Sequence, residues 1–171
     1  MKSASNRLSL SLVLALAALA GSASAATGTA TFDVTASVPA TCTITTNALA
    51  FAPYNPSGAS AVDANGAVNV LCTNGTSFWI GLDNGLGTGA TAASRKMRDT
   101  VLGSALLSYS LYTDSARTIT WDGSQVASNS GSGLGMGTPV ALTVYGRIPS
   151  GQSNVTASTA YLDTITSTIT Y

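Results

Sequence analysis

Residues 30–38 read ATFDVTASV, and apolar and polar side chains alternate along this stretch without a break. Successive side chains of a β-strand point to opposite faces, so the pattern predicts an amphipathic strand. The apolar face of this strand consists of Ala30, Phe32, Val34, Ala36 and Val38.

Shorter runs of the same kind follow along the chain and are separated by Gly, Pro, Asn and Asp. We expect strands over residues 41–45, 67–72, 78–82, 106–112, 118–121, 139–145 and 161–171, with a long connection over 84–105 and a flexible loop over 131–137. Glu is absent and charged residues make up only 8% of the chain, which disfavours helices. Seven to nine strands at this spacing predict one all-β domain, a β-sandwich.

The last run, residues 161–171, alternates up to Tyr171 and carries neither Pro nor charge after Asp163. Natural sheets usually protect such a strand when it lies at an edge. The strand over 30–38 can fill an empty edge, either in its own domain or in a neighbouring molecule. The short tether of residues 39–41 before Cys42 favours projection away from the strand that carries Cys42, but the pattern leaves both alternatives open.

Residues 1–25 have the layout of a secretory signal peptide. Lys2 and Arg7 frame the start, an apolar run covers residues 8–20, and Ala23-Ser24-Ala25 forms a small-residue cleavage site. An apolar run of this length is shorter than the about 20 residues that span a bilayer, so a membrane anchor is the weaker interpretation. We expect an exported protein without a transmembrane segment, in which five basic and seven acidic side chains give a net charge of −2.

Cys42 and Cys72 are the only cysteines of the chain. Export places them in an oxidising compartment, where an even pair predicts a disulfide. A metal site would need further ligands and a catalytic thiolate would need a base, and the chain has no His. We therefore expect a structural disulfide and no bound metal.

The composition also limits the function. The absence of His excludes His-dependent catalysis, and seven Lys and Arg residues are too few to predict a nucleic-acid-binding surface. We expect neither an enzyme nor a cofactor. Arg95, Lys96 and Arg98 are candidate contacts for an anionic surface or polysaccharide, and Trp121 is a candidate for stacking on a sugar ring. The favoured interpretations are a solvated loop for the three cations and core packing for Trp121.

Three segments in the second half of the chain carry a family resemblance. They are LYTD at residues 111–114, YGRIPSGQ at 145–152 and YLDTITSTITY at 161–171. Together with the Cys42 strand and the sequence CTNGT at 72–76, they resemble the spore coat U domain family, which includes pilins of the archaic chaperone–usher pathway.

The resemblance implies an immunoglobulin-like β-sandwich that lacks its last strand. Residues 1–25 are then the signal peptide, 26–39 an N-terminal donor strand segment and 40–171 the pilin domain. The donor side chains are those of the apolar face described above, and the groove that receives them is bounded by Ile165, Ile169 and Tyr171.

The resemblance further implies a structural pilus subunit that polymerises by donor-strand exchange and supports attachment and biofilm formation. Its partners are neighbouring subunits, a periplasmic chaperone and an outer-membrane usher, and its location is the periplasm in transit and then the cell surface. The alternative is a secreted sandwich that completes its own sheet and binds carbohydrate or forms a cell or spore coat.

Overall fold

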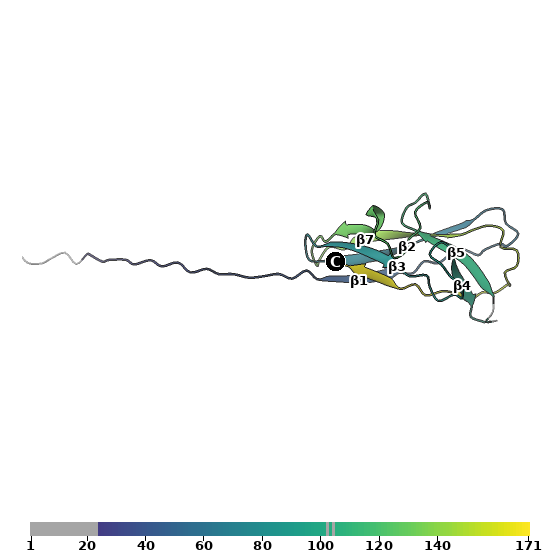
Figure 1. The fold of residues 1–171 in the computed structure, drawn as a ribbon, viewed down its shortest axis with the longest axis horizontal. Coiled ribbons are helices and arrows are strands. Elements are labelled where there is room, and N and C mark those ends of the chain that lie inside the picture. The colour runs from purple at the N-terminus through teal and green to yellow at the C-terminus, as the bar shows by residue number, and fades with distance from the viewer. Residues whose placement is uncertain (1–23, 102, 104) are drawn as a thin grey trace, which may run out of the picture. The chain divides into compact units, whose positions relative to one another are not determined.

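Six antiparallel strands form the larger of two sheets, in the order β1-β2-β7-β5-β4-β8 (Figure 1). The computed structural model describes residues 24–101, 103 and 105–171. The strands of this sheet are β1 (Cys42–Asn47), β2 (Val62–Cys72), β4 (Arg95–Asp99), β5 (Leu106–Tyr112), β7 (Val140–Ile148) and β8 (Tyr161–Leu162). Along β2, Val68, Val70 and Cys72 are buried and the residues between them are less so, which is the period of two expected for a strand with one face on the core.

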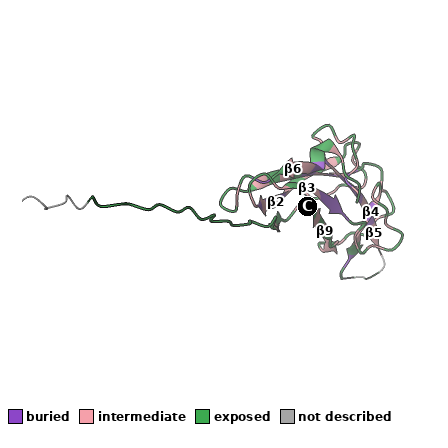
Figure 2. Cartoon of the chain, turned by 60° about the vertical axis from the view of Figure 1, so that its left-hand side comes forward, coloured by how far each residue is buried: buried purple, intermediate pink, exposed green. Residues whose placement is uncertain are grey.

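The smaller sheet has the order β6-β3-β9. It consists of β3 (Ser77–Leu82), β6 (Ser130–Ser132) and β9 (Ser167–Thr170), and a single turn of 3₁₀-helix, η1 (Ala127–Asn129), precedes β6. The two sheets enclose one core, and the ribbon is coloured purple at its buried residues in Figure 2. Its apolar members are Val68, Val70, Cys72, Phe78, Ile80, Leu82, Leu107, Tyr109, Leu111, Trp121, Val144 and Ile148.

The predicted all-β sandwich is confirmed, and most predicted strands are present with shifted ends. Two strands were not predicted: β4 lies within the expected connection over 84–105, and β6 lies at the start of the expected flexible loop. The expected strand over 118–121 is reduced to an isolated bridge between Thr120 and Tyr112. Charges conceal the alternation of β4 and glycines that of β6, whereas residues 118–121 alternate in sequence but pair only at Thr120.

The C-terminal run is divided into two strands that belong to different sheets. β8 pairs with β4 in the larger sheet, whereas β9 pairs with β3 in the smaller one. Residues 163–166 make the crossing because the Asp163 carboxylate accepts backbone hydrogen bonds from Leu86 and Thr164 instead of continuing a ladder. One apparently continuous sequence pattern therefore connects both layers of the sandwich.

The chain divides into two units, Met1–Ser37 and Val38–Tyr171. The signal peptide predicted over residues 1–25 lies outside the described residues except for its last two positions. Residues 24–41 form neither helix nor strand and are exposed, with Phe32 and Val34 each 85% exposed (green in Figure 2). The strand predicted over 30–38 is thus not formed in the single chain, because a lone strand has no ladder partner for its backbone N–H and C=O groups.

Candidate functional site: an open groove between two sheet edges

The two sheets each end in an edge strand beside the same cavity. In the described part of the chain, β1 is paired only by β2 and β9 only by β3. The end of β1 and the start of β9 line a cavity of about 440 Å³. β1 begins at the disulfide, where Cys42 is opposite Cys72, and β9 ends with Thr170 opposite Trp79, near the start of β3, which follows Cys72 after a short turn. β1 and β9 therefore run in opposite directions, and the cavity that opens between the end of β1 and the start of β9 is the groove.

The floor of this groove is the hydrophobic core itself. The cavity is lined by core side chains of both sheets and by Leu49 and Phe51 from the segment after β1. Phe51 packs edge-on against Tyr109, with ring centroids 6.1 Å apart. The apolar lining also includes Val68, Leu82, Met97, Leu111, Val144 and Ile165. Leu49, Phe51, Met97 and Ile165 pack against the buried core but are themselves only partly buried. Partly buried apolar side chains beside two unpaired strand edges are what a missing strand would leave behind.

One wall of the groove is the segment around β9. Ser167 and Ile169 are partly buried and alternate with the exposed Thr168 and Thr170. The Ser167 hydroxyl is buried and has no hydrogen-bond partner among the described residues. Of the three residues expected at the groove edge, Ile165 lines the cavity, Ile169 packs against the core, and Tyr171 lies beyond the end of β9 with 57% of its surface exposed.

A hydrogen-bonded connection holds the start of this wall. The Tyr109 hydroxyl donates to Asp163 Oδ2 at 2.7 Å, and Asp163 Oδ1 accepts from the Leu86 amide at 2.8 Å. Burial and the adjacent Asp163 carboxylate raise the pKa of Tyr109, because both disfavour the phenolate. Tyr109 therefore remains a donor over the whole neutral range.

A second carboxylate holds the segment just before β9. Asp83 Oδ1 accepts hydrogen bonds from the Gly85 and Thr166 amides, both at 3.0 Å. Burial raises the pKa of Asp83, but the hydrogen bonds from Thr166 and Gly85 outweigh it and the pKa is lowered overall. The end of β3 and the start of β9 are thereby joined by side chain as well as by the ladder.

Arg95 and Trp121, two of the candidate ligand contacts, are fully buried. The Arg95 guanidinium donates to the carbonyl oxygens of Asp83, Ala92 and Trp121 at 2.6–2.9 Å. The Trp121 indole donates to the Ile80 carbonyl at 2.9 Å. Neither side chain is available to a ligand, which corrects the candidate assignment for both. The core-packing interpretation of Trp121 describes its position.

Lys96 and Arg98, the other two candidates, lie on β4 and not in a solvated loop. Lys96 donates to the Ser108 hydroxyl of the neighbouring strand at 3.0 Å, and Arg98 is exposed. Because Arg95 is buried in the core, the three cations do not form one surface patch. The reason is that the segment is extended, so that neighbouring side chains point in opposite directions.

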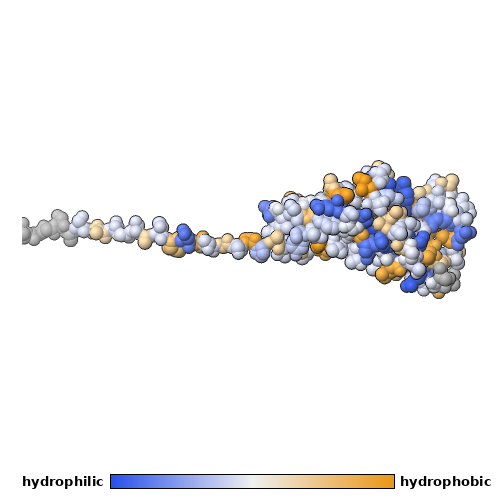
Figure 3. Space-filling model, viewed as in Figure 1, coloured by the Kyte–Doolittle hydropathy of each residue, from blue (hydrophilic) through white to orange (hydrophobic). Residues whose placement is uncertain are grey.

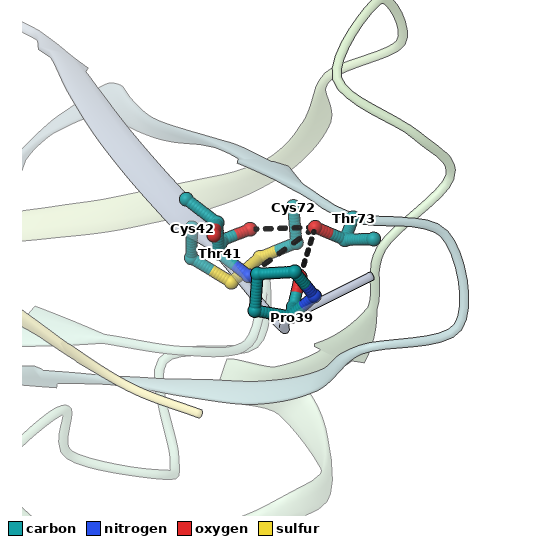
Figure 4. Close-up of a disulfide and its surroundings, with 5 residues drawn as sticks. All are labelled: Pro39, Thr41, Cys42, Cys72 and Thr73. Atoms are coloured by element: carbon teal, nitrogen blue, oxygen red, sulfur yellow. Dashed lines mark hydrogen bonds between the residues drawn. A yellow bond between two sulfur atoms is a disulfide. The ribbon is translucent and has the colours of Figure 1, made fainter. Parts of the chain in front are cut away.

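The predicted disulfide between Cys42 and Cys72 is present and joins β1 to β2 (Figure 4). The chain that leads into β1 is held beside it. Thr73 Oγ1 donates to the carbonyl oxygen of Pro39 at 3.3 Å and accepts from the Thr41 amide at 3.2 Å. The Thr73 amide donates to the Thr41 carbonyl at 2.9 Å. These hydrogen bonds hold residues 39–41 against the domain, so the path of the chain is fixed from Pro39 onward.

Comparison with known proteins agrees with this geometry. Residues 28–168 match the Spore Coat Protein U domain. The chain belongs to this family. Protein U of Myxococcus xanthus is 39% identical over 152 residues, a match that covers 80% of each chain.

A solved structure has the same fold as this Spore Coat Protein U domain. It is the CsuC–CsuE chaperone–tip adhesion subunit pre-assembly complex from archaic chaperone-usher Csu pili of Acinetobacter baumannii. The match has a TM-score of 0.51 at 18% identity, and covers 78% of this chain and 40% of that chain. This likeness establishes a shared fold, in agreement with the two-sheet sandwich described above.

Several groove residues of this Spore Coat Protein U domain were not singled out in the sequence. Leu49 and Phe51 stand in the run ALAF at 48–51, whose period of two is a strand-like signal too short to stand alone. Tyr109 and Asp163 carry no local signal, because their contact joins positions 54 residues apart. Among the described residues, no three His, Cys, Asp or Glu side chains gather into a metal site, and no helix is long and apolar enough to cross a membrane.

Proposed function

We propose that this chain is a structural pilus subunit that polymerises by donor-strand exchange. Residues 30–38 of one copy insert into the groove between β1 and β9 of the next. The observation that carries the proposal is an open groove with an apolar floor in a chain whose N-terminal segment has an unpaired apolar face. Main-chain ladders would supply affinity, and alternate side chains would enter the core.

Donor and groove wall share a period of two. Along the wall, positions 163, 165, 167 and 169 are partly buried and alternate with exposed ones, and the donor offers five apolar positions from Ala30 to Val38. The donor's polar face of Thr, Asp and Ser would then meet solvent, like Thr168 and Thr170 of β9. The proposal includes a signal peptide over 1–25, a donor segment over 26–39 and a pilin domain over 40–171.

The same open groove calls for protection before assembly. Unpaired edges and partly exposed core residues aggregate unless they are covered. We assign this task to a periplasmic chaperone and the exchange to an outer-membrane usher, in line with the chaperone–usher system named for the structural neighbour. The finished fibre would lie at the cell surface and support attachment and biofilm formation. The role is structural and not catalytic.

The experiment separates donor from groove. A chain that begins at Pro39 lacks the donor and is refolded with a synthetic peptide of residues 29–38. We expect the peptide to bind and to raise the melting temperature, and the unfilled domain to be unstable or to aggregate. A peptide with Phe32→Asp should fail, whereas one with Thr35→Asp on the polar face should bind normally. A truncated domain that remains monomeric and as stable as the polymer would contradict the proposal.

The alternative of a self-complemented carbohydrate-binding module or coat protein predicts a different result. The full chain would be a monomer that forms no ladders on gels without boiling, and it would bind saccharide. The burial of Trp121 removes the residue on which sugar stacking depended.

A further inference from the structure

Two pairs of large apolar side chains are exposed near opposite ends of the groove. Near the end that Asp163 marks lie Leu86 and Leu162, which are 76% and 61% exposed; we call them the groove-end pair. The Leu86 amide donates to Asp163 and Leu162 directly precedes it, so both are fixed beside that carboxylate. Apolar side chains reach the domain surface in separate patches on the face shown in Figure 3.

The second pair, Leu134 and Met136, is 60% and 50% exposed; we call it the disulfide-end pair. It follows Gly133, which is held by backbone hydrogen bonds with Gly75 and Thr76 in the turn after Cys72. The disulfide-end pair therefore lies beside the point at which the chain leaves the domain. Exposed aliphatic side chains that are grouped in this way mark contact surfaces more often than scattered ones do.

The linker between a donor and its own domain is too short to allow the two to lie far apart. Pro39 and Thr41 are both bound by Thr73, and the donor ends at Val38. Three residues reach at most about 10 Å even when fully extended. A donor seated in the groove of one copy must therefore bring the disulfide end of its own domain directly against that copy.

The direction in which the donor inserts decides which end of the receiving groove lies against the donating domain. Every ladder among the described strands is antiparallel, and a donor antiparallel to β9 places Val38 beside Asp163. The reverse direction would place the donating domain over the disulfide end of the receiver, where the receiver's own residues 39–41 leave. Only the first direction lets each copy receive and donate at once, as an open filament requires.

We infer that the disulfide-end pair of one copy packs against the groove-end pair of the next copy. Resting on the proposed function, this contact would be a second interface beyond the inserted strand. All four side chains are apolar and exposed in the single chain, and none of the four positions carries a charge. The contact would hold successive domains close and slow their separation.

The test compares assembled polymers, in which this contact would be present, with the free donor peptide, which lacks the disulfide-end pair. We expect the double variant Leu134→Ser/Met136→Ser to assemble but to release subunits about tenfold faster or more, because two apolar side chains lose their burial. Ile119→Ser is the matched control, since Ile119 is 44% exposed and lies between β5 and η1, outside both pairs. Release rates equal to those of the control would overturn the inference.

Two further readouts separate this inference from the proposed function. The peptide of residues 29–38 lacks the disulfide-end pair, and Leu86 does not line the cavity, so peptide binding to the truncated domain should be unchanged by Leu86→Ser. Failure of the peptide to bind the unaltered domain would contradict donor exchange itself. A photo-crosslinking residue in place of Met136 should join peptides that contain Leu86 or Leu162 of another chain; a polymer crosslinked only elsewhere would refute the contact.

Discussion

Tyr109 on β5 donates a hydrogen bond of 2.7 Å to Asp163, 54 residues further along the chain. Asp163 lies where the C-terminal segment leaves β8 in the larger sheet and crosses to β9 in the smaller one. Its other oxygen accepts from the Leu86 and Thr164 amides. One carboxylate thus links the start of the groove wall to β5 of the larger sheet and to the loop that follows β3.

Tyr109→Phe should lower the free energy of unfolding by about 1–3 kcal/mol. The variant loses a hydrogen bond to a carboxylate, and Asp163 Oδ2 is left without the Tyr109 donor. The same change should weaken donor-peptide binding, since Ile165 is two residues from Asp163. Urea unfolding of the truncated domain with bound peptide measures both effects. Tyr112→Phe on the same strand is the control and should behave like the parent, because Tyr112 makes no side-chain hydrogen bond among the described residues. Equal losses in both variants would count against a specific role for Asp163.

The same residue predicts a dependence on alkaline pH. Burial and Asp163 raise the pKa of Tyr109 above the ordinary value of 10.0. The unfolded chain therefore releases this proton at a lower pH than the folded chain does, and stability is retained below about pH 10 and lost above it. Urea unfolding should show that the free energy of unfolding of the parent is lower at about pH 11 than at about pH 8. This decrease should be smaller in Tyr109→Phe. An identical drop in both proteins would place the alkaline sensitivity elsewhere.

The sandwich itself was predictable because apolar and polar residues alternate along most of its strands. The segment 95–99 was not, since RKMRD carries three cations and one acid among five residues. It forms β4 because backbone carbonyls of three other segments solvate the buried Arg95, and no local pattern announces those partners. The groove was foreseeable as an unpaired C-terminal strand, but its floor and the Tyr109–Asp163 bond depend on contacts between distant parts of the chain.

Arg95→Lys should destabilise the domain by about 3 kcal/mol or more, because an ammonium cannot reach the carbonyls of Asp83, Ala92 and Trp121 together. The exposed Arg98→Lys on the same strand is the matched control and should change stability by less than about 0.5 kcal/mol. Denaturant unfolding followed by tryptophan fluorescence measures both, since Trp121 is buried in the folded state. A small loss in Arg95→Lys would mean that water replaces the missing donors.

Removal of the disulfide should cost about 3–4 kcal/mol, as expected for a cross-link that closes a loop with a sequence separation of 30. The double variant Cys42→Ser/Cys72→Ser and the reduced parent should show similar decreases in the melting temperature. Reducing agent should leave the double variant unaffected, which provides the control. A parent whose melting temperature does not change on full reduction would contradict the estimate.

Ser167 offers a test in which stability and assembly change in opposite directions. Its hydroxyl is buried without a hydrogen bond among the described residues, and it lines the cavity of about 440 Å³. Ser167→Ala should therefore be neutral or raise stability by up to about 1 kcal/mol, because no bond is lost and a polar group leaves an apolar site.

Ser167→Leu should raise the melting temperature of the truncated domain further, since the added carbons cover core surface that is now open. The same carbons occupy the space that a donor side chain needs, so donor-peptide affinity should fall at least tenfold in Ser167→Leu and remain near parental in Ser167→Ala. Thermal unfolding and peptide titration on the same three proteins decide the matter, and a leucine variant that binds the peptide as tightly as the parent would show that the donor does not enter this cavity.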